Sequence, residues 1–125
     1  MIVEDDPDGM KILGLMLATA GYEVLRAYGV EDALRKLKTQ RVDIILTDLA
    51  MPKMSGVELI AAVKKDLITR NIPVVAVTAF LWDQIAQAAG QAGCDGFVGK
   101  PFNRERLVNE IERHFNQPQV DRQRA

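Results

Sequence analysis

The sequence predicts an α/β fold: a doubly wound, five-stranded parallel sheet in the order 2-1-3-4-5, covered by five helices. Along the chain, apolar residues alternate between the period of two that is typical of strands and the period of 3.6 that is typical of amphipathic helices. Strict alternation of this kind indicates parallel strands with helices on both faces of the sheet. The central apolar runs are nearly continuous, as expected for strands buried on both faces.

The first two strand–helix units lie near the amino terminus. Residues 1–3 are a short apolar run that ends in acids, and residues 8–20 carry apolar side chains at helical spacing. Residues 23–26 fit a strand, and residues 30–37 repeat apolar side chains on one helical face. Each unit therefore predicts one strand followed by one helix.

Three further units follow in the same order. Residues 42–47 form a nearly continuous apolar strand, and a helical stripe begins at Val57 and ends at Leu67. Residues 73–77 are another buried strand, and residues 82–92 fit a helix rich in small side chains. The last predicted strand and helix cover residues 96–98 and 107–115.

The composition fits one globular domain and disfavours several other classes. A chain of 125 residues has room for one domain, which we expect over residues 1–116, followed by a polar tail over residues 117–125. The net charge of −1 argues against direct binding of nucleic acid, which normally needs a basic excess. No apolar run approaches the ~20 residues of a membrane span, and the acidic start does not fit a signal peptide.

The single cysteine and the single histidine support a structural rather than a chemical role. Cys94 alone excludes a disulfide framework and suits a cytoplasmic location. His114, near the carboxyl end of the last helix, is expected at the surface, where it would complement the helix dipole. One histidine cannot build a metal site.

Polar side chains follow four of the predicted strands. Glu4 and Asp5 come after the first strand, Asp48 after the third, Thr78 after the fourth and Lys100 after the fifth. In the flavodoxin-like order 2-1-3-4-5, these carboxyl ends are neighbours around the point where the strand order reverses, and doubly wound sheets bind ligands there. We therefore expect the carboxylates, the hydroxyl and the ammonium group to converge.

This set of groups suits phosphoryl transfer. Clustered carboxylates repel one another, so a hard divalent cation is the natural partner, and oxygen ligands favour Mg²⁺. Mg²⁺ commonly adds a phosphate oxygen to its carboxylates, and a carboxylate can itself accept a phosphoryl group as an acyl phosphate. Lys100 and Thr78 would then bind the remaining phosphoryl oxygens.

Each of these residues also has an ordinary structural interpretation. Asp48 could cap a turn, and Asp5 or Asp6, which precede a proline, could cap a helix. Thr78 could end its strand, and Lys100 could be a solvated surface lysine. Each alternative is plausible alone, but their coincidence at four strand ends of one sheet favours a shared site.

Four strings at these strand ends resemble the receiver domains of two-component response regulators. They are residues 3–6 (VEDD), 47–56 (TDLAMPKMSG), 73–79 (PVVAVTA) and 100–102 (KPF). The resemblance covers residues 1 to about 115, and the order, spacing and placement of the strings all agree. It implies a stand-alone, single-domain receiver that acts as a phosphorylation-dependent switch in a phosphorelay.

The resemblance also implies roles for the acidic residues. Asp48 would accept a phosphoryl group from the phosphohistidine of a histidine kinase or a histidine phosphotransfer protein. Asp5, Asp48 and the backbone carbonyl of Ala50 would ligate Mg²⁺, and Glu4 would act through a metal-bound water. The domain would catalyse only its own phosphorylation and dephosphorylation, and would signal by binding a downstream protein target as a monomer or as a phosphorylation-dependent dimer.

Further roles are implied on the fourth and fifth strands. Thr78 and Lys100 would hold the phosphoryl oxygens, and the bond between Lys100 and Pro101 is expected to be cis. Thr78 would move inward on phosphorylation and allow Phe97 to change rotamer. The family often has tyrosine at the position of Phe97, so this chain lacks a hydroxyl in its switch.

Three residues near the site suggest how it is tuned. Ala50 and Phe80, two residues past Asp48 and Thr78, cannot hydrogen-bond a hydrolytic water, so we expect slow self-dephosphorylation. Trp82 could be a partner-contact aromatic or could simply pack against the sheet, and the sequence favours neither.

Two other functions can be compared with the switch. A Mg²⁺-dependent phosphohydrolase with an aspartyl-phosphate intermediate usually has a second acid two residues past its nucleophile, where this chain has Ala50. A flavodoxin-like cofactor binder needs a phosphate-binding loop after the first strand, but acids at residues 4–6 would repel a phosphate there. The switch is therefore the preferred function and the phosphohydrolase is the alternative.

Overall fold

Five parallel strands form one sheet in the order β2-β1-β3-β4-β5, as predicted. The computed structural model describes residues 1–51, 54–79 and 84–115. The strands are β1 (Ile2–Val3), β2 (Arg26–Ala27), β3 (Ile45–Thr47), β4 (Val74–Thr78) and β5 (Gly96–Gly99). The helices are α1 (Pro7–Thr19), α2 (Val30–Leu37), α3 (Gly56–Lys65), α4 (Gln84–Ala92) and α5 (Arg104–Phe115).

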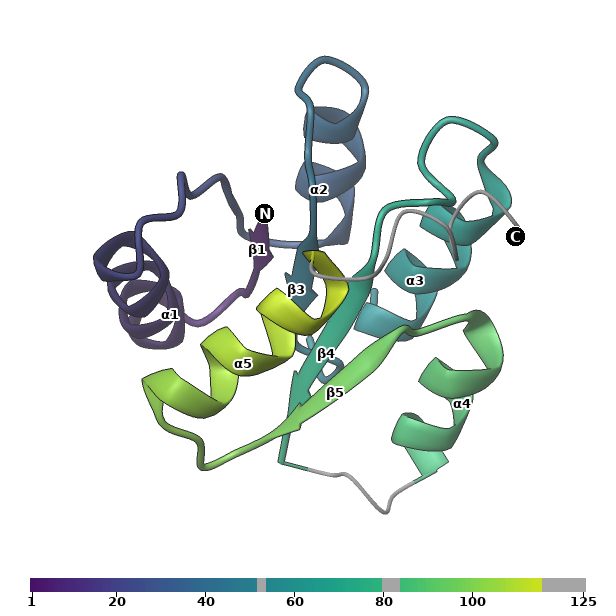
Figure 1. Ribbon diagram of the computed structural model, residues 1–125. Coiled ribbons are helices and arrows are strands. Elements are labelled where there is room, and N and C mark those ends of the chain that lie inside the picture. The colour runs from purple at the N-terminus through teal and green to yellow at the C-terminus, as the bar shows by residue number, and fades with distance from the viewer. Residues whose placement is uncertain (52–53, 80–83, 116–125) are drawn as a thin grey trace.

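The helices cover both faces of the sheet (Figure 1). Val3 and Ile45 point to one face and pack in a core cluster with residues of α2, α3 and α4. Ile2 and Leu46, their neighbours in sequence, point to the other face and pack with residues of α1 and α5. This alternation explains why the central strands are almost wholly apolar, since each face of the sheet is buried under helices.

The register of the sheet aligns the strand ends that the sequence singles out. Val3 pairs with Thr47, Thr47 pairs with Ala76, and Ala76 pairs with Phe97. β1 and β3 end at Val3 and Thr47, and β4 and β5 end two residues further on, at Thr78 and Gly99. The residues after all four strands therefore leave the sheet at the same end, which we call the carboxyl edge.

The second and third strands are shorter than predicted. The expected strand over residues 23–26 is found at Arg26–Ala27, and the expected strand over residues 42–47 is found at Ile45–Thr47. β1 lies between these two strands and pairs with both of them, starting at Ile2. The residues that precede Arg26 and Ile45 therefore have no residue of β1 to pair with. The two chain segments instead line a groove at the opposite end of the sheet, which we call the amino edge, together with Leu17, Tyr22, Ile111 and Phe115.

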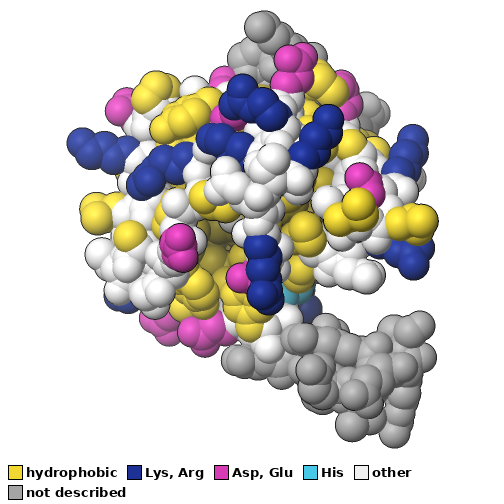
Figure 2. All heavy atoms as spheres, turned by 90° about the horizontal axis from the view of Figure 1, so that it is seen from above, with side chains coloured by type: hydrophobic (Ala, Val, Ile, Leu, Met, Phe, Trp, Pro, Cys, Tyr) yellow, Lys and Arg dark blue, Asp and Glu magenta, His cyan; other side chains and the backbone are white. Residues whose placement is uncertain are grey.

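Figure 2 looks onto this amino edge, where hydrophobic side chains show between scattered Lys and Arg residues. The charged groups here include Arg41 and Asp43, whose side chains form an exposed ion pair at 3.3 Å. The carboxylates that concern the function lie at the other end of the strands.

One apolar position was wrongly assigned to the third helix. α3 ends at Lys65, because Asp66 adopts an extended conformation with ψ of 125°. The Asp66 carbonyl then accepts hydrogen bonds from the N–H groups of Thr69 and Arg70, which turns the chain. Leu67 is consequently 76% exposed instead of packing in the helical stripe.

The expected surface position of His114 is also wrong. Its side chain is only 10% exposed, and its Nε2 lies 2.9 Å from Oε2 of Glu110, one turn earlier in α5. The same Glu110 oxygen accepts a hydrogen bond from Arg113 at 2.7 Å. His114 thus belongs to a polar cluster that faces β5 rather than to the solvated end of the helix.

The start of α1 decides which acid is the helix cap. Asp6 is the N-cap, because its carboxylate accepts hydrogen bonds from the N–H groups of Asp8 and Gly9. Asp5 is therefore not needed for capping. Within the described parts of the chain, none of the helices has the length and apolarity to span a membrane.

Candidate functional site

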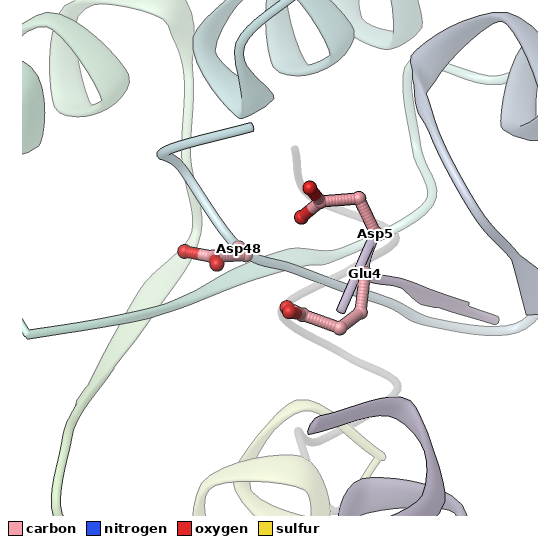
Figure 3. A group of neighbouring side chains, drawn as sticks. All are labelled: Glu4, Asp5 and Asp48. Carbon is pink, nitrogen blue, oxygen red and sulfur yellow. The ribbon is translucent and has the colours of Figure 1, made fainter. Parts of the chain in front are cut away.

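Three carboxylates meet at the carboxyl edge of the sheet. Glu4 and Asp5 follow β1, and Asp48 follows the adjacent strand β3. One carboxylate oxygen from each residue lies within 4.8 Å of the other two. Figure 3 shows these side chains at the ends of neighbouring strands, with Glu4 and Asp5 extending toward the side on which Asp48 lies. The structure thus brings together the three acids that the sequence singles out.

Glu4 has an unusual environment for a carboxylate. Glu4 is 3% exposed, and its Oε1 accepts a long hydrogen bond of 3.3 Å from the Asp6 N–H. Its Oε2 is buried and has no hydrogen-bond partner among the described residues. Burial, followed by the negative charge of Asp48, raises the pKa of Glu4 to about 7.

These properties fit a hard divalent cation. A buried carboxylate oxygen without a partner is unfavourable, and two further acids nearby increase the repulsion. A cation bound among the three would supply the missing partner and offset the charge. The donor set contains only oxygen atoms, which suits Mg²⁺ better than zinc or copper.

Asp48 is held in place from several directions. Its N–H donates to the carbonyl of Val3 at 3.1 Å, which ties it to β1. One carboxylate oxygen accepts a long hydrogen bond from the N–H of Ala50 at 3.3 Å, and the other lies 3.6 Å from Nζ of Lys100. The side chain is 15% exposed, so it is largely buried but still reached by solvent.

Lys100 and Thr78 are placed by the pairing of β4 with β5. The N–H of Lys100 donates to the carbonyl of Thr78 at 2.9 Å, and Thr78 is buried at 1% exposure. The peptide bond between Lys100 and Pro101 is cis. Because β4 lies between β3 and β5 in the sheet, the Lys100 ammonium group approaches Asp48 from the far side of β4.

Other residues with predicted roles are placed less decisively. Phe97 lies on β5, is partly buried and packs against the core cluster beneath α2 to α4. Ala50 is exposed. Phe80 and Trp82 lie outside the described residues, so their predicted roles in dephosphorylation and partner contact have no structural counterpart here.

Gly56, the first residue of α3, supports the site in a way that sequence reasoning missed. A Cβ atom at this position would overlap the backbone carbonyl oxygen of Asp48 and lie 2.9 Å from Cα of Leu49. The Gly56 N–H also donates to the carbonyl of Leu49 at 2.9 Å. Glycine thus lets α3 start directly against the backbone that carries the Asp48 carboxylate. The signal was present, because Gly56 ends one of the strings quoted for the resemblance.

Comparisons with known proteins agree with this geometry. The family described as the response regulator receiver domain matches residues 1–112. The polar-differentiation response regulator DivK of Brucella anthropi is 35% identical over 115 residues, which cover 92% of this chain and 94% of that protein.

Solved structures give the same result. The chemotaxis protein CheY4 of Vibrio cholerae superposes with a TM-score of 0.84 at 31% identity, covering 90% of this chain and 93% of that one. The receiver domain of a sensor histidine kinase from Pseudomonas aeruginosa, with a magnesium ion coordinated in its active-site cleft, gives a TM-score of 0.87 at 28% identity, covering 93% and 95%. The chain belongs to the response regulator receiver domain family.

Proposed function

We propose that this protein is a phosphorylation-dependent signalling switch in which Asp48 accepts a phosphoryl group from a phosphohistidine. The observation that carries the proposal is the convergence of Glu4, Asp5 and Asp48 within 4.8 Å, with Lys100 beside Asp48. Receiver domains work as switches of this kind, and they bind Mg²⁺ in an acidic pocket. The donor would be a histidine kinase or a histidine phosphotransfer protein in the cytoplasm.

The metal ligands in this proposal are Asp5, Asp48 and the backbone carbonyl of Ala50, with Glu4 acting through a water. When bound, Mg²⁺ would neutralise the carboxylates and polarise the transferring phosphoryl group. The unpartnered, buried oxygen of Glu4 supports this assignment, because it gives the acid an environment that favours a nearby cation.

In the proposed reaction an oxygen of Asp48 attacks phosphorus. The new oxygen–phosphorus bond forms as the phosphorus–nitrogen bond of the donor breaks, and the imidazole nitrogen keeps the electron pair. Lys100, now 3.6 Å from the carboxylate, and Thr78 would bind the remaining phosphoryl oxygens as charge is transferred. Hydrolysis of the acyl phosphate would return the chain to its starting state.

The output would be a change of binding surface rather than turnover of a substrate. A phosphoryl group on Asp48 would bind the Lys100 ammonium and draw Thr78 inward. Phe97, on the neighbouring strand, would then change its rotamer. The altered surface, with Trp82 as a candidate contact, would bind a downstream protein target or a second copy of the chain.

The proposal is tested by phosphorylation with a small phosphodonor. With Mg²⁺ and acetyl phosphate, we expect intact mass to show the gain of one phosphoryl group in the wild type and none in Asp48→Asn. Asp43→Asn is a matched control, because Asp43 is an exposed aspartate at the amino edge, and it should be labelled normally. Absence of labelling, with steady release of phosphate from small phosphate esters, would favour the phosphohydrolase instead.

We also propose that dephosphorylation is slow. Ala50 and Phe80 offer no hydrogen bond to an attacking water. The double variant Ala50→Asn/Phe80→Glu should shorten the lifetime of the phosphorylated protein, as followed by intact mass after removal of the donor. An unchanged lifetime would contradict this part of the proposal.

A further inference from the structure

The first turn of α1 lies directly against the carboxyl group of Glu4. The residue at the contact is Gly9, the third residue of the helix. A Cβ atom built on Gly9 would lie 3.1 Å from Oε1, 3.3 Å from Cδ and 3.4 Å from Cγ of Glu4. These separations are tighter than an ordinary Cβ contact, so one side would have to shift by a few tenths of an ångström.

Both sides of this contact are constrained. The Gly9 N–H donates to the N-cap carboxylate of Asp6 at 3.3 Å, and the Asp6 N–H in turn donates to Oε1 of Glu4 at 3.3 Å. Two hydrogen bonds thus connect Gly9 through Asp6 to Glu4. Glu4 is 3% exposed, so its carboxyl group cannot swing into solvent without leaving the site.

We propose that Gly9 is a positioning residue for the metal site. The absence of a side chain at this position lets the helix fix the Glu4 carboxylate at its distance from Asp5 and Asp48. The inference rests on the proposed function, in which these acids hold Mg²⁺. Mg²⁺ demands nearly ideal octahedral geometry, so even a small displacement of Glu4 should weaken binding.

The direct test is the Mg²⁺ affinity of Gly9→Ala, measured by isothermal titration calorimetry on the intact chain. We expect the dissociation constant to rise roughly tenfold, the effect typical of disturbing a group that orients metal ligands. Gly90→Ala is the matched control, because Gly90 lies in helix α4 and a Cβ added there would meet no atom within 4 Å. It makes the same chemical change in a helix and should leave the affinity unchanged.

A second measurement separates the contact from a general effect on the helix. Without metal, Gly90→Ala should stabilise the chain because alanine favours helix, whereas Gly9→Ala should gain less or lose stability. In a Glu4→Ala background the contacted atoms are gone, so Gly9→Ala should then stabilise as Gly90→Ala does. This cycle also covers the case in which Gly9→Ala alone fails to fold, since the double variant should fold.

The outcomes distinguish this inference from the function on which it rests. Mg²⁺ binding by the wild type together with an unchanged affinity in Gly9→Ala would overturn the positioning role. Equal stability changes for Gly9→Ala in the Glu4 and Glu4→Ala backgrounds would overturn it too. Failure of the wild type to bind Mg²⁺ would instead refute the proposed metal site itself.

Discussion

Glu4 and Asp48 are neighbouring carboxylates in different surroundings. Asp48 has the Lys100 ammonium 3.6 Å away, whereas Glu4 is buried and its Oε2 lacks a hydrogen-bond partner among the described residues. The pKa of Glu4 is about 7, against 4.5 for an ordinary glutamate. Between these two pH values, and without metal, Glu4 holds a proton in the folded chain that it has released in the unfolded chain. The stability that protonated Glu4 contributes should therefore decline as the pH rises from 4.5 to about 7.

Gly56 gives the prediction that belongs to the residue scale. Gly56→Ala should destabilise the fold by about 1–3 kcal/mol, as overpacking typically does, because the added Cβ meets the backbone of Asp48 and Leu49. Backbone atoms cannot move aside as the end of a flexible side chain can. Chemical denaturation of Gly56→Ala beside Gly90→Ala would check this, and equal stabilities for the two variants would contradict it.

For single residues, the sequence predicts which side chains take part in chemistry better than it predicts which side chains contact one another. Asp48, Thr78 and Lys100 could be singled out because each follows an apolar strand, and parallel strands bring their ends together. Gly9 could not be, since nothing in the sequence says which side chain a helical glycine faces. The contact depends on how closely α1 lies over the end of β1, which only the packed structure determines.

At the scale of elements, α5 is fastened to β5 by a polar cluster. Glu110 on α5 is 8% exposed and accepts hydrogen bonds from Arg113, which also reaches the carbonyl of Asp95 before β5. Oε2 of Glu110 lies so close to Gly96, the first residue of β5, that a Cβ atom on Gly96 would collide with it. Charged side chains, as well as the apolar core, thereby hold α5 in position against β5.

Glu110→Gln should weaken this attachment in a pH-dependent way. Burial alone would raise the pKa of Glu110, but the bonds from Arg113 and His114 outweigh it and hold the pKa below its usual value of 4.5. The stabilising contribution of the carboxylate is thus complete above pH 4.5 and is lost as the pH falls through the lower, folded-state pKa. We expect Glu110→Gln to lower the free energy of unfolding by about 1–2 kcal/mol at pH 7. The difference between the wild type and the variant should become smaller in acid.

Urea denaturation of the wild type and Glu110→Gln between pH 3 and pH 7 would measure the difference. Glu112→Gln, an exposed change on the same helix, is the control and should show little effect. A difference between wild type and Glu110→Gln that stays constant over this range would refute the role of the Glu110 charge.

Element types and their order were predictable, whereas several boundaries were not. Apolar periodicity identified every strand and helix, but a strand ends where its partner ends. Residues 42–44 have the composition of a strand and lie outside β3 because β1 pairs only from Ile2. Leu67 fits the helical period of α3, yet the extended backbone of Asp66 ends the helix before it. Pairing and backbone turns of this kind depend on neighbours that a local pattern does not contain.

For the whole molecule, the acidic cluster predicts that Mg²⁺ stabilises the fold. A ligand that binds only the folded chain adds about 2.7 kcal/mol when present at 100 times its dissociation constant. Thermal unfolding should therefore shift upward by several degrees with Mg²⁺ and return on addition of EDTA. The shift should be lost in Asp5→Asn/Asp48→Asn, and a shift of equal size in that variant would show that the ion acts elsewhere.

The groove at the amino edge has a practical consequence for working with this domain. Met1 and Phe115, the first residue and the last described residue of the final helix, both line it, at the end of the sheet opposite Asp48. Met1 and Phe115 therefore both lie away from the carboxylates and Lys100. A probe placed at an exposed residue of this edge, such as Arg41 or Asp43, would leave the reactive edge open to a phosphodonor.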